Sequence, residues 1–127
     1  MIHNVRCART REAIALAVAG KNGCDYCASA HSTIASGLKI DAETITQLLS
    51  GRAQDARLQA ILTLAVAIVD ERGHLAESDL DAARAAGLSD ADIVETVGNV
   101  VVNIFTNYLN NVAETDIDFP VRRAVAA

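Results

Sequence analysis

Two cysteines and a histidine lie close together in a segment where thiol chemistry is possible. Cys24 and Cys27 form a C-x-x-C pair, and His31 follows the second cysteine after three residues. Gly23 stands directly before the pair, and the alanines after it favour a helix that runs to Gly37. On that helix the three side chains are spaced three and then four residues apart, which places them on one face. The spacing therefore indicates a redox site.

The spacing of the two cysteines also suits a reversible disulfide. One turn of helix brings their Cα atoms to about 5 to 6 Å, the separation that an unstrained disulfide prefers. A thiol near a helix N-terminus feels the positive end of the helix dipole, and His31 lies one turn after Cys27 as a base or ion-pair partner. Both effects favour the thiolate, which is the nucleophilic form of cysteine.

The composition is that of a small water-soluble domain. The 127 residues are 51% hydrophobic and 21% charged, so we expect one domain over residues 1–127 with a core of its own. A net charge of −5 argues against nucleic acid or an anionic membrane as a partner. No apolar run approaches the roughly 18 residues that a membrane span needs. A close pair among three cysteines favours a catalytic dithiol in the reducing cytoplasm over a structural disulfide framework.

An apolar run near the N-terminus has two interpretations. Residues 13–19 follow three arginines and end like the cleavage site of a signal peptide. Glu12 stands directly against this run, however, and the run is short for a signal sequence and makes a good amphipathic helix. We therefore expect a first helix over residues 9–20 that ends in the turn 20–23. Cys7 has no partner at a fixed spacing and is expected to fill space rather than to react.

Capping residues and glycines divide the rest of the chain into four further helices. Asp41 and Asp55 are residues of the type that caps helix N-termini, and the sequence around Ser89 resembles a capping box. The predicted ranges are 42–50, 56–72, 77–86 and 90–112. With the two helices before them, they predict an all-α fold of about six helices. The apolar run 61–69 is expected to be central in this fold or to lie in an oligomer interface.

The last of these segments has an ambiguous pattern. Val100–Val102, Ile104 and Phe105 are β-branched or aromatic and could form a buried strand. We favour a helix, because residues 90–112 lack turn signals and a lone strand among helices would have no partner. Gly98 weakens a helix interior, and it therefore predicts a close contact with another helix at that point.

A stripe of asparagines follows the same segment. Asn99, Asn103 and Asn107 are spaced by four residues, and Asn110 and Asn111 come after them. The favoured interpretation is an exposed or interfacial face whose amides bind neighbouring backbone. The alternative is that the stripe lines a site, for which Asn103, Asn107 and Asn111 are the candidates.

Four residues and the spacing between them resemble a known sequence signature. Glu12, eleven intervening residues, and then Cys24, Cys27 and His31 resemble the E-x11-C-x-x-C-x-x-x-H pattern of the alkylhydroperoxidase AhpD and carboxymuconolactone decarboxylase-like family. The segment 103–120 is similar to the closing helix and tail of that family. The resemblance implies a compact all-helical domain.

The resemblance also implies a reaction and a role for each residue. Cys27 is the attacking thiolate, Cys24 is the resolving thiol and His31 is the base, while Glu12 orients His31 or passes protons to it. Tyr26, between the cysteines, is a further candidate for lining the site. The implied activity is thiol-dependent reduction of hydroperoxides or of a partner disulfide. No cofactor is implied beyond the redox-active disulfide between the two cysteines.

Partners and an assembly follow from the same resemblance. Members of this family reduce peroxides, or pass electrons to a peroxiredoxin from a dihydrolipoyl-type carrier, and their subunits form trimers or hexamers. We therefore expect a homo-oligomer. The chain departs from the family at Asn111, where many relatives carry a histidine, and it begins close to the signature helix without the helical segment that longer members place upstream.

The sequence is also compatible with several alternatives. Without the family spacing, Glu12 is typical of a solvated residue at a helix start. The motif supplies three metal ligands whereas structural zinc takes four, and the fourth would have to be His3, Cys7 or His74. For the whole protein, the alternatives are a lactone-acid enzyme of the carboxymuconolactone decarboxylase type and a non-catalytic scaffold or small-molecule binder with an idle dithiol.

Overall fold

The computed structural model of the chain describes residues 4–124, which form six helices and no strand. The helices are α1 (Ala8–Asn22), α2 (Asp25–Gly37), α3 (Ala42–Leu49), α4 (Ala56–Asp70), α5 (Glu77–Ala85) and α6 (Asp90–Ala113). The predicted all-α fold is confirmed, and the ambiguous segment 100–105 is helical. None of these helices is long and apolar enough to cross a lipid bilayer.

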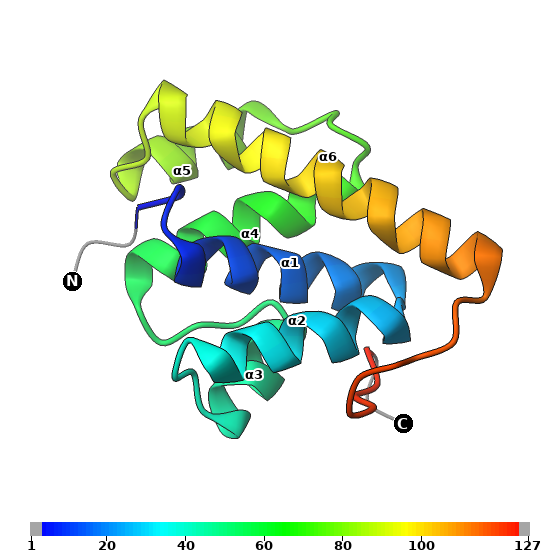
Figure 1. Cartoon of the computed structure of the whole chain (residues 1–127). Helices are drawn as coiled ribbons and strands as arrows, with labels where there is room; N and C mark the ends of the chain where they lie inside the picture. Colours follow the sequence, from blue (N-terminus) through cyan, green and yellow to red (C-terminus); the bar gives the residue numbers. More distant parts are fainter. Residues whose placement is uncertain (1–3, 125–127) are drawn as a thin grey trace.

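Helix α1 lies at the centre of the fold and contacts α2, α3, α4 and α6 (Figure 1). Every residue from Ala13 to Ala19 is buried. Alanines alternate with larger aliphatic residues along this segment, so neighbouring helices approach α1 closely from several sides. The apolar run 61–69 in α4, which the sequence placed at the centre or in an interface, is buried mainly along the face that packs on the core. The central helix is therefore α1.

Helix α1 does not end at Gly20, where the sequence predicts its end. The helix continues through Gly20 to Asn22, and Gly23 ends it in the left-handed conformation with φ 65°. Gly20 serves a close contact instead, since a Cβ at this position would lie 2.0 Å from the carbonyl oxygen of Leu49. The backbone of α1 therefore touches the end of α3, and the chain turns only at Gly23.

The predicted helix caps are confirmed. The carboxylates of Asp41 and Asp55 accept hydrogen bonds from backbone N–H groups in the first turns of α3 and α4. Ser89 and Asp92 exchange hydrogen bonds in a capping box that opens α6. The prediction at Gly98 is wrong within the chain, because Gly98 is exposed and no neighbouring element lies within 4 Å of an added Cβ.

Replacing Gly20 by alanine is expected to lower the free energy of unfolding by about 2 kcal/mol, because the added Cβ meets backbone that cannot move aside. Gly37→Ala at the end of α2 is the matched control, since no atom lies within 4 Å of an added Cβ there. Alanine at that position is expected to change the free energy of unfolding by less than about 1 kcal/mol, in the stabilising direction. Urea unfolding followed by circular dichroism measures both. Equal stability of the two variants would contradict the close contact.

Candidate active site

The two cysteines of the C-x-x-C pair meet at the start of α2. Cys24 is the N-cap residue, and its sulfur accepts a hydrogen bond from the Cys27 N–H at 3.2 Å. The Cys24 thiol also donates to the sulfur of Cys27, with the two Sγ atoms 2.6 Å apart. The turn at Gly23 sets this arrangement, because it lets the Cys24 N–H donate back to the carbonyl of Ala19 at 3.1 Å. The structure thus brings the two predicted thiols together.

Both thiols are buried in a small apolar cluster. Cys24 is 0% exposed and Cys27 is 3% exposed, and they pack with Ala19, Ala28 and Ala124. Burial raises the pKa of the Cys24 thiol well above its ordinary value, and the hydrogen bond to Cys27 acts in the same direction. Cys24 therefore stays protonated near neutral pH and remains a hydrogen-bond donor to Cys27.

Glu12 of α1 and His31 of α2 form a second pair beside the thiols. The Oε2 atom of Glu12 lies 2.7 Å from Nδ1 of His31, and the two side chains are only 16% and 23% exposed. A carboxylate can only accept a hydrogen bond, so Nδ1 carries the hydrogen and a neutral His31 presents Nε2 as its acceptor. This contact favours an orienting role for Glu12 over the alternative of a solvated residue.

The sulfur of Cys27 has a further polar neighbour on α6 rather than on α2. The Nδ2 atom of Asn110 lies 3.5 Å from Cys27 Sγ and also donates to the Thr106 carbonyl at 2.9 Å. No hydrogen bond joins His31 to Cys27, both of which are among the described residues. Sequence reasoning did not single out Asn110, because nothing in the asparagine stripe shows which amide reaches α2. The sequence feature that could have identified Asn110 is its position three residues after Asn107, about one helical turn further along α6.

Two of the three predicted lining residues of α6, Asn107 and Asn111, bind α1 instead of the thiols. Asn103 and Asn107 are buried, with Asn103 donating to backbone one turn earlier and Asn107 accepting from the side chain of Asn22 at 3.0 Å. Asn111 is exposed and donates to the Asn22 carbonyl at 3.4 Å. Asn103 and Asn107 are thus buried rather than exposed, whereas the side-chain amides of Asn99, Asn103 and Asn110 donate to backbone carbonyls, as the favoured interpretation expects. Of the stripe, Asn110 also donates to a thiol.

The segment after α6 returns across the start of α2 (Figure 1). We call residues 115–124 the tail strap. The carboxylate of Asp25 accepts hydrogen bonds from the Ala124 N–H at 2.8 Å and from the Arg123 side chain at 3.0 Å. These contacts, above all the backbone hydrogen bond from Ala124, lower the pKa of Asp25. Because Ala124 also belongs to the apolar cluster around the cysteines, the tail strap helps to cover them.

Tyr26 connects the dithiol segment to the tail strap. Its ring packs edge to face against Phe119, with the ring centroids 5.8 Å apart. A hydrogen bond with the Asp118 carboxylate raises the pKa of the Tyr26 hydroxyl. Tyr26 also packs against the cysteine cluster, so this predicted lining residue lies between the thiols and the strap.

The other candidate metal ligands lie elsewhere or outside the described residues. Cys7 is the exposed N-cap residue of α1, with its sulfur 3.1 Å from the Thr10 hydroxyl, and it lies at the opposite end of that helix from Cys24. His74 is exposed in the loop after α4. His3 lies outside the described residues. Within residues 4–124 no three His, Cys, Asp or Glu side chains are grouped to hold a metal ion.

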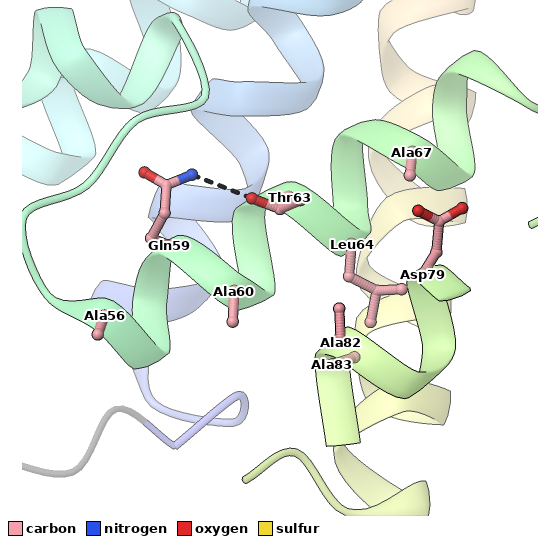
Figure 2. A pocket seen from close by; sticks show the side chains of 9 residues that line it. All are labelled: Ala56, Gln59, Ala60, Thr63, Leu64, Ala67, Asp79, Ala82 and Ala83. Atoms are coloured by element: carbon pink, nitrogen blue, oxygen red, sulfur yellow. Dashed lines mark hydrogen bonds between the residues drawn. The ribbon is translucent and has the colours of Figure 1, made fainter. Parts of the chain in front are cut away.

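A separate groove of about 310 Å³ lies between α4 and α5 (Figure 2). Alanines form most of its wall, and its polar side chains already have partners. Gln59 and Thr63 are hydrogen-bonded to each other at 3.1 Å, and Asp79 accepts from the Ala76 N–H. None of the thiols lines this groove, so we assign it no part in the chemistry.

The chain matches one family model. Residues 8–56 match the Carboxymuconolactone decarboxylase family, and this segment carries Glu12, Cys24, Cys27 and His31. The match confirms the resemblance that the spacing of these four residues predicts. No curated protein matches the chain.

A solved structure shares the fold. It is described as an uncharacterized peroxidase-related protein from Silicibacter sp. TM1040, and it superimposes with a TM-score of 0.77 at 23% sequence identity. The superposition covers 94% of this chain and 62% of that chain, so this chain spans about 62% of its neighbour's length. The likeness shows a common arrangement of helices.

Loosening the tail strap is expected to expose the dithiol. Asp25→Asn removes the charge that holds Arg123 and Ala124, and it should speed alkylation of Cys24 and Cys27 by maleimide about threefold or more, since a partly exposed ionic hydrogen bond contributes about 0.5 to 1 kcal/mol. Asp41→Asn, which removes a capping carboxylate from α3, is the control and should leave the rate unchanged. Both variants are made in a Cys7→Ser background.

The same anchor gives a pH dependence whose direction follows from the Asp25 pKa. Because that pKa is lower in the folded chain than the ordinary value of 3.8, the contact stabilises the strap above pH 3.8 and is lost as the pH falls through the folded pKa. The amide resonance of Ala124 should accordingly titrate with a midpoint below 3.8. Equal alkylation rates in the two variants, or a midpoint above 3.8, would contradict the role of the anchor.

Proposed function

We propose that the chain is a thiol-dependent peroxidase or disulfide reductase in which Cys27 attacks and Cys24 resolves. The observation that carries the proposal is the contact of the two sulfur atoms, 2.6 Å apart at the start of a helix, with the amide of Asn110 on Cys27. The family match over residues 8–56 and the fold of the peroxidase-related neighbour support it.

The environments of the two thiols support this order of attack. Burial keeps Cys24 protonated, so it is poorly suited to attack first. Cys27 lies in the first turn of α2, where the helix dipole favours negative charge, and it receives hydrogen bonds from the Cys24 thiol and from Asn110. Such donors stabilise a thiolate at Cys27.

In the first step the Cys27 thiolate attacks the terminal oxygen of a hydroperoxide. A sulfur–oxygen bond forms, the oxygen–oxygen bond breaks, and the alkoxide leaves as an alcohol after taking up the proton that the thiol released. His31 is the group that holds this proton in between, with Glu12 stabilising the charged ring. Because no direct hydrogen bond joins His31 to Cys27, we infer that the hydroxyl of the bound peroxide bridges the two.

In the second step Cys24 attacks the sulfenic acid on Cys27. The disulfide bond forms, the sulfur–oxygen bond breaks, and the hydroxide leaves as water with the proton of the Cys24 thiol. The short distance between the two sulfur atoms means that this step needs little backbone movement. If the substrate is instead a partner disulfide, a mixed disulfide with Cys27 precedes the same closure.

The cycle is completed by a two-electron donor. A dithiol of the dihydrolipoyl type reduces the Cys24–Cys27 disulfide and becomes a disulfide itself. The reduced Cys24–Cys27 pair can then pass its electrons to a peroxiredoxin disulfide in place of a peroxide. A carrier of this size must reach a sulfur that is 3% exposed or less, so we propose that the tail strap moves away during this step.

Serine substitutions separate the two thiol roles. Cys27→Ser is expected to lower peroxide turnover at least about 100-fold, because a serine hydroxyl is far less nucleophilic than a thiolate. Cys24→Ser should allow a single oxidation of Cys27 to a sulfenic acid, detected by a dione probe, but no turnover with a dithiol donor. Cys7→Ser is the control and should behave as the unmodified protein.

Two outcomes would contradict the proposal. Full peroxide turnover by Cys27→Ser would show that another group attacks the peroxide. Activity toward a lactone acid that survives alkylation of all thiols would assign the chain to the decarboxylase type that the family is named for.

Asn110 is expected to support the attacking thiolate directly. Asn110→Asp keeps the size of the side chain but places a negative charge beside Cys27, and it should slow the second-order oxidation of Cys27 about tenfold or more, whereas Asn110→Ala should slow it about fivefold. Asn111→Ala, one residue further along α6 and exposed, is the control. Stopped-flow oxidation gives the rates and urea unfolding excludes loss of structure. A faster reaction in Asn110→Asp than in Asn110→Ala would contradict this role.

A further inference from the structure

One polar side of α2 holds the tail strap. Its polar residues are spaced by four, three and four positions, so they lie on the same side of the helix; they are Asp25, Ser29, Ser32 and Ser36. The strap runs along this side in the opposite direction to the helix. The Ala124 N–H donates to Asp25, and the Arg122 N–H donates to the Ser29 hydroxyl at 2.8 Å. The strap is thus hydrogen-bonded to the first two of these positions.

Beyond these two positions the tail strap and α2 enclose a cavity of about 290 Å³. Three residues of the strap and three hydroxyl-bearing residues of α2 line it. They are Pro120, Val121, Arg122, Ser32, Thr33 and Ser36. Arg122 is the only charged residue among them, and none is acidic. The last two positions of the polar side therefore border a cavity that is positively charged on balance.

The hydroxyl of Ser32 has no hydrogen-bond partner, although Ser32 is only 7% exposed. Five other helical hydroxyl groups donate to the carbonyl four residues earlier, namely those of Ser29, Thr33, Thr46, Thr96 and Thr106. Ser32 makes no such bond to the Ala28 carbonyl. A buried hydroxyl without a partner destabilises the fold, so an acceptor bound in the cavity that Ser32 lines would be favourable.

Arg122 brings an uncompensated positive charge to the same cavity. It is half-buried, and its Nη2 atom donates to the Ala42 carbonyl and to the Thr46 hydroxyl, neither of which is charged. No carboxylate among the described residues forms an ion pair with it, whereas Arg57, also half-buried, pairs with Asp92. A guanidinium has several N–H donors, so Arg122 retains donors for a further acceptor.

We propose that this cavity binds a phosphate group, which links Ser32 of α2 to Arg122 of the tail strap. A free hydroxyl and a guanidinium without an acidic neighbour favour an anion. Phosphate is tetrahedral and accepts hydrogen bonds from several directions, which suits donors on two separate elements, whereas a carboxylate presents its oxygen atoms in one plane. Inorganic phosphate and a phosphomonoester share this chemistry.

Bound phosphate would attach the strap to α2 at a third position, after Asp25 and Ser29. Because the strap helps to cover Cys24 and Cys27, phosphate would slow access to both thiols. In the catalytic cycle, the electron donor would then reach the disulfide more slowly. This last effect rests on the proposed function, whereas phosphate binding does not.

Isothermal titration calorimetry of the full chain with inorganic phosphate tests the site. The heat should saturate at one phosphate per chain. Ser32→Ala should weaken binding about threefold or more, and Arg122→Gln about tenfold or more, because Arg122 supplies the charge as well as hydrogen bonds. Arg52→Gln removes the same charge from an exposed arginine that does not line the cavity, and it should leave the affinity unchanged.

Two further measurements define the role of Ser32 and the source of the phosphate. Ser32→Ala should keep or raise the stability toward urea, since it removes a buried hydroxyl without a partner, so weaker binding in this variant would not come from a damaged fold. Glycerol 3-phosphate is titrated in parallel. Tighter binding than that of inorganic phosphate would identify a phosphomonoester as the ligand, and weaker binding would identify the free anion.

Maleimide alkylation in a Cys7→Ser background measures the effect on the strap. Phosphate at about ten times its dissociation constant should slow alkylation of Cys24 and Cys27 about tenfold, because a ligand that binds only the closed strap lowers the open fraction in proportion. In Arg122→Gln the same concentration should slow it about twofold or less. Sodium chloride of equal ionic strength is the control and should not slow it, since screening weakens the exposed pair of Arg123 with Asp25.

Two results would overturn the proposal. One is a titration without saturable phosphate binding, or with equal affinity in the unmodified chain and in Arg122→Gln. The other is phosphate that binds but leaves the alkylation rate unchanged, which would exclude the link between α2 and the strap. Neither measurement uses a peroxide, so a failure of the proposed peroxidase or reductase activity would leave both results unaffected.

Discussion

The site depends on the tight packing of α1 among its neighbours. The alternating alanines of α1 have short side chains, so neighbouring helices pack close to it. Gly20 also lets the backbone of α1 touch the carbonyl of Leu49. This packing fixes where α1 ends, and the turn at Gly23 then delivers Cys24 to the start of α2. The same packing brings Glu12 within 2.7 Å of His31. One buried helix thus positions both pairs of the site without carrying a thiol itself.

The two thiols are buried, whereas the proposed reaction requires access to them. Burial keeps Cys24 protonated and supplies Cys27 with a donor, which suits an ordered pair of thiols. The same burial hides both sulfur atoms behind Ala124 and Tyr26. We propose that the tail strap resolves this conflict, since its ion pair between Arg123 and Asp25 lies at the surface and such pairs are individually weak. In the proposed reaction, a segment held in this way closes over a small peroxide and opens for a larger electron donor.

The sequence predicts the elements of this fold better than their contacts. Caps such as Asp41 and Ser89 are local, so their spacing reveals them directly. The two misjudged glycines show the limit. The sequence predicts a turn at Gly20, but Gly20 lies within α1 against the carbonyl of Leu49. It predicts a close helix contact at Gly98, but no neighbouring element lies within 4 Å of a Cβ added there, because only the tertiary packing decides which backbone has a neighbour. Asn110 is not predicted as a site residue for the same reason, since its contact with Cys27 depends on how α6 crosses α2. Glu12 and His31 could be paired only through the family spacing, because no local rule joins residues on different helices.

Peptide mass spectrometry is the most direct test of whether Cys24 and Cys27 form a redox couple. The reduced protein is treated with one equivalent of hydroperoxide, alkylated and digested. The peptide that contains both cysteines should lose two hydrogen atoms, with Cys7 still alkylated and the change reversed by a dithiol. Free, alkylated Cys24 and Cys27 after the peroxide has been consumed, or oxidation confined to Cys7, would contradict it.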